Sequence, residues 1–183
     1  LGPGESRVLE PVRVALGPDA SRLLEAYATL WGRRGNARTR GPFQSGWCSW
    51  YRFFHDVTEE DLLGNLDALS RSRDSLPVDV VQLDDGYQRA IGDWLETNDR
   101  FPSGLPALAK RIRDAGFTPG LWTAPFCVVP ESRVAQGHPE WLLRKEEDED
   151  EFLVGTFVPA WTASGSVHAL DTTREEVIRH LES

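Results

Sequence analysis

The chain has 183 residues, and its 40% of hydrophobic residues, with seven Trp among the large side chains, suffices to build the buried core of one domain. The formal net charge of −9 argues against nucleic acid or an anionic membrane as a partner, because these polyanions would be repelled over most of the surface. Apolar runs fall far short of the roughly 20 residues that cross a bilayer, and no basic-then-apolar signal begins the chain, so we expect neither a membrane span nor a targeting segment.

The first predicted element is a helix over residues 19–31, in which apolar side chains repeat at helical spacing. Asp19 is the candidate N-cap and Gly32 the candidate stop. The next segment, 32–42, is basic, rich in glycine and without apolar periodicity, which predicts a linker. We therefore interpret residues 1–42 as a leading helix and a linker before the main domain.

Strands and helices alternate after this linker. GWCSWY, residues 46–51, is an aromatic run that predicts a first strand, and the Leu spacing of residues 58–69 predicts a helix. Thr58 and Asp61 have the spacing of a capping box at its start. Residues 78–84, VDVVQLD, predict a second strand whose continuous apolar character is typical of a parallel sheet covered on both faces.

Three further elements complete the alternation. LPALAKRIRDAG, residues 105–116, predicts a helix, and FTPGLWTAPF, residues 117–126, predicts a third strand. A last helix is predicted over residues 171–183, with Thr172 and Glu175 at capping-box spacing.

The pattern predicts an α/β fold with a parallel sheet, either doubly wound or closed as a (β/α)8 TIM barrel. The strand starts near residues 46, 78 and 117 are spaced close to the value of about 31 residues per unit that a barrel of about 250 residues implies. The segment 127–170 is too long for a plain connection, and long loops after strands are where barrels build their sites. Its charged run, residues 145–151, predicts an exposed tip.

The second predicted strand ends in two adjacent carboxylates, Asp84 and Asp85, followed by glycine. An Asp-Gly pair is common in plain turns, but ligands collect at the carboxyl ends of parallel strands. The acid and nucleophile of a retaining glycosidase stand about 5–5.5 Å apart across the scissile bond, an arrangement that neighbouring residues do not favour. The pair is better suited to accept hydrogen bonds from vicinal hydroxyls.

A metal site is the competing interpretation of these carboxylates. Asp84, Asp85 and Asp93 could supply oxygen ligands to Mg²⁺, although no spacing motif supports this. We therefore expect no metal and no other cofactor.

Four Trp fall at or just beyond the predicted strand ends: Trp47, Trp50, Trp94 and Trp122. Each could simply pack in the core, but a flat aromatic face complements the C–H face of a pyranose ring.

The cysteines and histidines carry no recognisable motif. Cys48 and Cys127 lie far apart without C-x-x-C spacing, which predicts neither a zinc site nor a disulfide framework and favours a reduced, cytoplasmic setting. We interpret both as small buried groups. The histidines form no metal-binding array, and we predict no role for them: His55, His138, His168 and His180.

Taken in order, several motifs resemble the α-galactosidases (melibiases) of glycoside hydrolase family 36. These are GWCSWY, VQLDDGYQ, IGDW, FPSGL, GLWTAPF and LDTTREEV, which together cover most of the chain from Gly46. The absence of Met and the start LGPGES indicate a piece of a longer protein. The leading helix also resembles the family's bridge from an N-terminal β-sandwich domain.

The resemblance implies that residues 43–183 are roughly the first three βα units of a (β/α)8 catalytic barrel, which hydrolyses terminal α-galactosides with retention through a covalent galactosyl-enzyme. It implies that Asp84 and Asp85 bind galactose hydroxyls, that Trp50 lines the sugar subsite and that Trp122 forms part of its wall. It also implies a loop-shaping or pocket-edge role at the substrate site for two more residues, Asp93 and Trp94.

The catalytic carboxylates of the resembled family are expected beyond Ser183. The family's nucleophile is an Asp in a Lys-x-Asp setting after the fourth strand, and its acid/base is an Asp after the sixth. The two lysines here, Lys110 and Lys145, stand in no such motif. We therefore predict no turnover by these residues alone.

Two other functions remain open. A galactosyltransferase of the raffinose-synthase type resembles this family around the Asp-Asp-Gly segment, and a non-catalytic carbohydrate-binding module would bind galactose without turnover. In each case the expected partner is a galactose-containing oligosaccharide, and an oligomer is possible.

Overall fold

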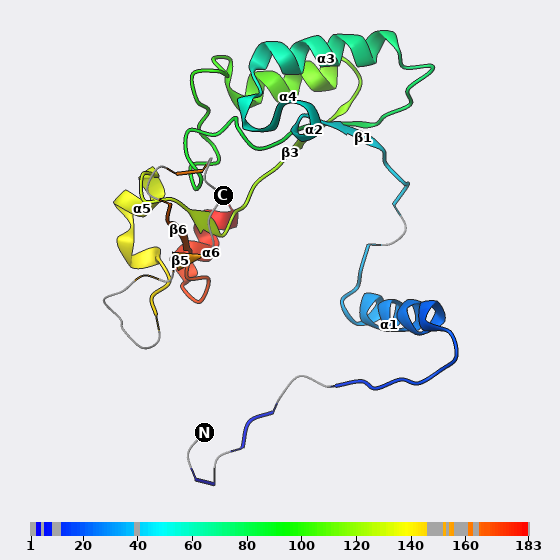
Figure 1. The fold of residues 1–183 in the computed structure, drawn as a ribbon, viewed down its shortest axis with the longest axis vertical. Helices are drawn as coiled ribbons and strands as arrows, with labels where there is room; N and C mark the ends of the chain where they lie inside the picture. The colour runs from blue at the N-terminus through cyan, green and yellow to red at the C-terminus, as the bar shows by residue number, and fades with distance from the viewer. Residues whose placement is uncertain are drawn as a thin grey trace. The chain divides into compact units, whose positions relative to one another are not determined.

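The computed structural model describes residues 3–4, 6–8, 12–38, 41–145, 152, 154–155, 161–162 and 165–182. The chain divides into two compact units, Leu1–Phe43 and Gln44–Ser183, and each is treated by itself (Figure 1). None of the helices in the described ranges is long and apolar enough to cross a membrane.

The first unit contains one helix, α1 (Ala20–Arg34), among its described residues. Its N-cap is Asp19, as predicted, whose carboxylate accepts a hydrogen bond from the Arg22 backbone at 3.2 Å. The predicted stop at Gly32 is wrong, because a single glycine inside a helix costs only about 1 kcal/mol and the helix continues past it. The chain turns instead at Gly35, whose N–H donates to the Trp31 carbonyl. That residues 1–42 follow a preceding domain stays a prediction.

The second unit contains a parallel sheet in the order β1 (Gly46–Cys48), β2 (Val80–Leu83), β3 (Thr118–Leu121). The helices α3 (Glu59–Arg71) and α4 (Gly104–Asp114) connect successive strands and lie on the same side of the sheet (Figure 1). The predicted βαβαβ order and the parallel sheet are therefore confirmed.

The helix α3 begins where its capping box predicts. The Thr58 hydroxyl accepts from the Asp61 N–H at 3.1 Å, and the Asp61 carboxylate accepts from the Thr58 N–H at 3.0 Å. Its buried side chains pack with those of α4 and of β2 in one hydrophobic cluster that contains Leu62, Leu66, Leu69, Leu108, Ile112, Val81 and Leu83. This cluster covers one face of the sheet.

The opposite face of β2 carries polar side chains. Val81 and Leu83 are buried toward the helices, whereas Val80 and Gln82 alternate with them and are half-buried. Successive side chains of a strand point to opposite faces, so Gln82 and Asp84 lie on the face away from α3 and α4.

All three predicted strands are shorter than expected, and the second is β2 in place of residues 78–84. The first ends at Cys48, because the chain turns into the short helix α2 (Trp50–Phe53) and the 3₁₀ turn η1 (Phe54–Asp56), so Trp50 is not a strand residue. The third ends at Leu121 and includes Pro119, which β3 tolerates because it is an outer strand of the sheet.

Residues 127–170 are not a plain loop. Among the described residues they contain a second sheet, antiparallel and in the order β4 (Cys127–Val128), β6 (Val167–Ala169), β5 (Val154–Gly155). The same segment includes α5 (Arg133–Gly137) and the 3₁₀ turn η2 (Pro139–Trp141). Apart from Lys145, the charged run 145–151 lies outside the described residues.

The last helix, α6 (Glu175–Glu182), begins two residues later than an N-cap at Thr172 would require. The Asp171 carboxylate accepts from the Thr173 N–H at 3.0 Å and from its hydroxyl at 2.6 Å, which forms a turn before the helix starts. Val177 of α6 packs against Val128, Ala135, Leu142 and Leu170, so this helix belongs to the core of the antiparallel sheet.

Candidate functional site

Asp84 and Asp85 follow the carboxyl end of β2, and both are buried, with exposed fractions of 8% and 3%. The backbone N–H of Asp84 donates to the Ser49 hydroxyl at 2.9 Å, which fixes the end of β2 against the turn after β1. The sequence thus brings two carboxylates to the edge of the sheet where two strand ends meet.

The Asp84 carboxylate is held by three donors. Its Oδ2 accepts from Gln82 Nε2 at 2.8 Å and from the Cys48 thiol at 3.2 Å, and its Oδ1 accepts from the Asp85 N–H at 2.9 Å. Burial raises the pKa of the Cys48 thiol, with a smaller increase from Asp84 that a hydrogen bond to the Trp50 backbone opposes. Cys48 is therefore a neutral donor to Asp84 and not a thiolate nucleophile.

The Asp85 carboxylate has a different set of partners. Its Oδ1 accepts from Gln88 Nε2 at 2.6 Å, and its Oδ2 accepts from the indole Nε1–H of Trp161 at 2.7 Å. His55 Nδ1 lies 3.4 Å from the same Oδ2. The two carboxylates are thus fixed separately, as expected for binding groups and not for a nucleophile paired with an acid.

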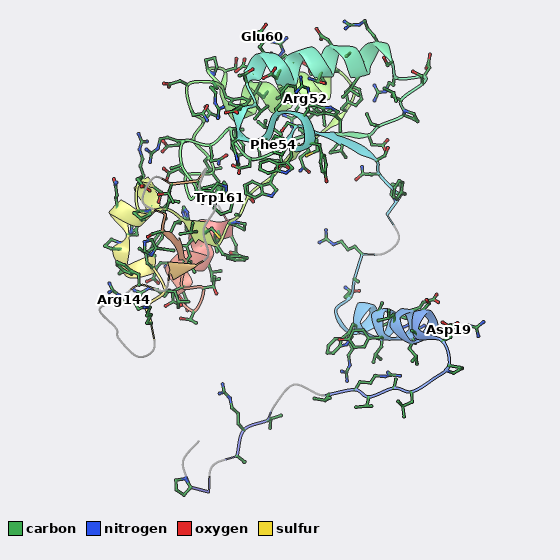
Figure 2. The ribbon with its side chains drawn as sticks, viewed as in Figure 1. Asp19, Arg52, Phe54, Glu60, Arg144 and Trp161 are labelled. Atoms are coloured by element: carbon green, nitrogen blue, oxygen red, sulfur yellow. The ribbon has the colours of Figure 1, made fainter. Side chains whose placement is uncertain are left out.

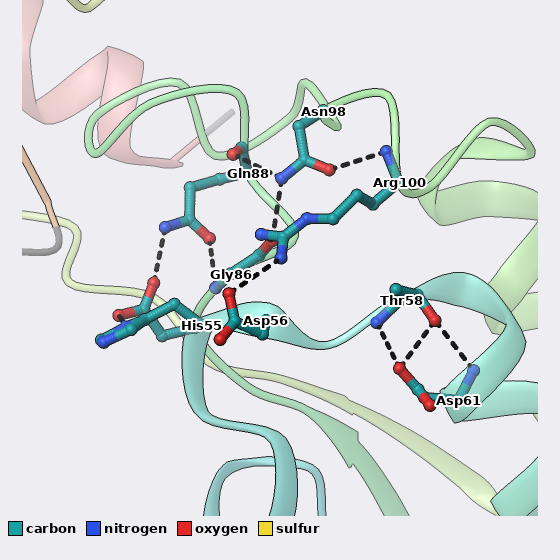
Figure 3. A network of polar contacts seen from close by, with 9 residues as sticks. His55, Asp56, Thr58, Asp61, Gly86, Gln88, Asn98 and Arg100 are labelled. Atoms are coloured by element: carbon teal, nitrogen blue, oxygen red, sulfur yellow. Dashed lines mark hydrogen bonds and ion pairs between the residues drawn. The ribbon is translucent and has the colours of Figure 1, made fainter.

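A polar network fixes the turn that contains Asp85 (Figure 3). The Gly86 N–H donates to Gln88 Oε1 at 3.0 Å, which orients the amide that holds Asp85. The Gly86 carbonyl accepts from Asn98 Nδ2 and from Arg100 Nη2, both at 2.8 Å. Because the Gly86 backbone and the Gln88 amide are both hydrogen-bonded, the Asp85 carboxylate is positioned before any ligand binds.

Gly86 is required by the backbone at this point. Its φ is +115°, and a Cβ added there would stand 2.6 Å from the carbonyl oxygen of His55. Phe54, next to His55, also has a positive φ, 51°. The close approach of these two chain segments brings His55 to Asp85.

The aromatic side chains connect the predicted site residues. The Trp50 ring lies edge-on to His55, with 5.1 Å between ring centroids, so it reaches Asp85 through that histidine. The Trp122 ring is 6.0 Å from Trp161 and 5.9 Å from Trp94. The structure therefore connects Trp50 to Asp85 through His55, and Trp122 to Asp85 through Trp161. Among these rings, Trp94 contacts only Trp122.

Two of the tryptophans have packing roles. Trp47 packs against the core cluster under α3 and α4. Trp94 packs against that cluster and against the one formed by Ile91, Val129 and Val167, and its Nε1 is buried with no hydrogen-bond partner among the described residues.

Asp93 fixes the start of α5. Its Oδ2 accepts from the Arg133 N–H at 3.1 Å, its Oδ1 accepts from the Val134 N–H at 3.3 Å, and it forms an ion pair with Arg89. Its carboxylate is buried and fully engaged. This geometry agrees with a loop-shaping role, whereas direct contact between Asp93 and a substrate stays a prediction.

We expect Asp93→Ala to lower the free energy of unfolding by about 2 kcal/mol, because two helix-terminal amides and Arg89 would lose their acceptor. Thermal unfolding of the purified protein measures the loss. Asp67→Ala, at an exposed site on α3, is the control and should leave the melting temperature nearly unchanged. An equal change in both variants would show that Asp93 does not hold α5.

In the described part of the chain, no three His, Cys, Asp or Glu side chains come together as a metal site. The Asp93 carboxylate accepts hydrogen bonds from the first backbone N–H groups of α5, and it shares no hydrogen-bond donor with Asp84 or Asp85 among the bonds described above. The groups that surround the two aspartates are amides, an indole, a thiol and the imidazole of His55, and donors of this kind suit a hydroxyl-bearing ligand better than a cation.

Six residues whose side chains contact the two aspartates were missed by the sequence interpretation: Cys48, Ser49, His55, Gln82, Gln88 and Trp161. For Gln88 a signal existed, because it lies two residues after the Asp-Asp-Gly turn. For Cys48, the signal is its position at the end of β1, where it pairs with Gln82 of β2, two residues before Asp84. His55 and Trp161 carry no local signal.

Comparisons with known proteins agree with one another. The Melibiase family model matches residues 47–180. The α-galactosidase AgaA of Geobacillus stearothermophilus is 30% identical over 156 residues, which are 78% of this chain and 20% of AgaA. The chain thus spans about a fifth of that relative's length.

Solved structures give the same result. TtGalA, an α-galactosidase from Thermus thermophilus solved in complex with p-nitrophenyl α-D-galactopyranoside, is 40% identical with a TM-score of 0.69, over 79% of this chain and 28% of that one. AgaA A355E, solved in complex with 1-deoxygalactonojirimycin, is 26% identical with a TM-score of 0.57, over 76% of this chain and 18% of that one.

Proposed function

The chain belongs to the melibiase family, the α-galactosidases of glycoside hydrolase family 36, and from this premise we propose that the whole protein hydrolyses terminal α-galactosides. The observation that carries the proposal is the pair Asp84 and Asp85, two buried and separately held carboxylates at the carboxyl end of β2. TtGalA, solved in separate complexes with stachyose and with p-nitrophenyl α-D-galactopyranoside, supports an oligosaccharide or galactoside substrate.

The proposed scaffold is a (β/α)8 barrel of which these residues supply roughly three units. The strand order β1-β2-β3 and the position of both connecting helices on one face support it, because every unit of a barrel puts its helix outside. Asp84 and Gln82, on the face away from those helices, would then point into the barrel at its carboxyl end, where such enzymes bind substrates.

The number of free acceptor positions on each carboxylate indicates how many substrate hydroxyls it can bind. An ionised carboxylate has about four lone-pair positions, and each aspartate already has three donors around it when His55 Nδ1 carries its hydrogen. Two donors surround each Oδ2 and one surrounds each Oδ1. We infer that Asp84 and Asp85 each accept one galactose hydroxyl, at Oδ1.

The proposed chemistry proceeds with retention. A carboxylate attacks the anomeric carbon while a carboxylic acid protonates the leaving oxygen. In the second step the same acid group, now a carboxylate, takes a proton from water, which attacks the anomeric carbon and releases galactose. Asp84 and Asp85 are engaged as binding groups, and the chain spans only 20% of AgaA, so we propose that both catalytic carboxylates lie in other parts of the protein and that the 183 residues alone do not turn over.

The test is hydrolysis of p-nitrophenyl α-D-galactopyranoside by the full-length protein, with ¹H NMR of the first-formed sugar. We expect p-nitrophenol release and α-galactose as the initial product, with the matching α-glucoside as the control. Inversion at the anomeric carbon, or equal rates on the glucoside, would contradict the proposal.

Two alternative functions give different results in related assays. A raffinose-synthase-type transferase would release p-nitrophenol only with a sugar acceptor present and would form a longer oligosaccharide. A carbohydrate-binding module would bind galactose saturably in calorimetry without any turnover by the full-length protein. A cytoplasmic location and the oligomeric state stay predictions.

A further inference from the structure

The indole of Trp161 reaches Asp85 from a distant part of the chain. Its Nε1–H donates to Asp85 Oδ2 at 2.7 Å, between residues 76 positions apart in sequence. The same side chain lies against Trp122, with 6.0 Å between ring centroids and an interplanar angle of 52°. Trp161, which is labelled in Figure 2, thus touches both a carboxylate and an aromatic wall of the proposed galactose subsite.

Packing and one adjacent hydrogen bond hold Trp161 in this place. Its ring packs against the buried cluster of Ile91, Val129 and Val167. The next residue, Thr162, is buried, and its hydroxyl donates to Glu131 at 2.9 Å. The position of Trp161 is therefore fixed from the antiparallel part of the unit and does not depend on Asp85 alone.

The hydrogen bond from Trp161 has a directional effect on Asp85. Gln88 binds Oδ1 at 2.6 Å, and the indole binds Oδ2 from another segment, so the carboxylate plane is held at both oxygens. A hydrogen bond to a charged acceptor is stronger than one between neutral groups. Without the indole N–H, the remaining hydrogen-bonding group at Oδ2 among the residues that the structure describes is His55, at the longer distance of 3.4 Å.

We propose that Trp161 is a positioning residue of the galactose subsite, which orients Asp85 toward one substrate hydroxyl and extends the aromatic wall from Trp122. This inference rests on the proposed function. It adds a specificity role: Trp161 favours galactosides that carry the hydroxyl that Asp85 accepts. The hydrogen bond orients the Asp85 carboxylate, and the indole ring extends the aromatic surface of Trp122.

The experiment separates these two contributions in the full-length protein. Trp161→Phe keeps a ring and removes the N–H, and we expect a loss of about 10-fold in kcat/KM on p-nitrophenyl α-D-galactopyranoside. Trp161→Ala removes both and should lose more. Trp141→Phe, in which another half-buried Trp of the same segment is changed in the same way, is the control and should stay within about twofold.

Substrates that lack single hydroxyls distinguish a positioning role from general destabilisation. With a series of monodeoxy α-galactosides, the penalty of Trp161→Phe should vanish for the one sugar that lacks the hydroxyl bound by Asp85. The penalty should also shrink in an Asp85→Asn background, since both changes act on the same contact. Melting temperatures of all variants are measured alongside.

An equal penalty with every sugar, or no penalty with any, would overturn the role of Trp161 while leaving the proposed function intact. Calorimetry with 1-deoxygalactonojirimycin is run on the same proteins. A wild-type protein that neither hydrolyses galactosides nor binds this ligand would overturn the proposed function, and the role of Trp161 with it.

Discussion

Asp85→Asn is expected to lower kcat/KM for an α-galactoside by at least about 100-fold in the full-length protein. The change removes the proposed charge-assisted hydrogen bond to the sugar. Its new NH2 group would also point N–H groups at one of the two donors that now bind the carboxylate, Gln88 at Oδ1 or Trp161 at Oδ2. Each such loss at a buried site costs about 1.5–3 kcal/mol, and 1.4 kcal/mol corresponds to a factor of ten. Steady-state kinetics with p-nitrophenyl α-D-galactopyranoside measure the change.

The same substitution at Asp84 should have an effect of similar size, because Asp84 is equally buried among donors. Asp67→Asn, on the exposed surface of α3, is the matched control and should leave kcat/KM unchanged. Wild-type rates in either site variant, with an unchanged melting temperature, would remove the two carboxylates from the substrate site.

Gly86→Ala is expected to lower the free energy of unfolding by at least about 3 kcal/mol, because it combines an unfavourable φ with a clash against backbone. The added Cβ would stand 2.6 Å from the His55 carbonyl oxygen, and that atom cannot move without shifting η1. Denaturant unfolding of the full-length protein, monitored by Trp fluorescence, measures the loss.

Gly64→Ala is the control for this change. Gly64 lies within α3, and a Cβ there meets no atom within 4 Å, so the substitution should stabilise the helix by about 0.5–1 kcal/mol. If Gly86→Ala were as well tolerated as Gly64→Ala, the backbone approach between Gly86 and His55 would not be a requirement of the fold.

The regular parts of the fold followed from local sequence patterns. The capping box of Thr58 and Asp61 located the start of α3, and the apolar run before Asp84 located β2, because caps and strand burial are set by neighbours in the chain. The antiparallel sheet was missed because its strands are only two or three residues long and pair Cys127 with Ala169. Periodicity cannot identify strands of that length.

The candidate site was predictable in its acceptors and not in its donors. Asp84 and Asp85 could be identified because two adjacent carboxylates at the end of an apolar strand lie where parallel sheets bind ligands. Trp161 could not be identified, since its contact with Asp85 joins residues that are 76 positions apart in sequence. Trp50 was placed on a strand, whereas the chain turns after Cys48 and presents it from α2.

The bond between Trp161 and Asp85 makes sugar affinity and local order thermodynamically reciprocal. If the correctly oriented carboxylate binds galactose more tightly, then bound galactose must stabilise the docked indole by the same free energy. Saturation with a galactoside should therefore slow amide hydrogen exchange around Thr162 and Val167, in a part of the chain that need not touch the sugar. Hydrogen exchange in the small antiparallel sheet would then show whether a galactoside is bound at the end of the parallel sheet.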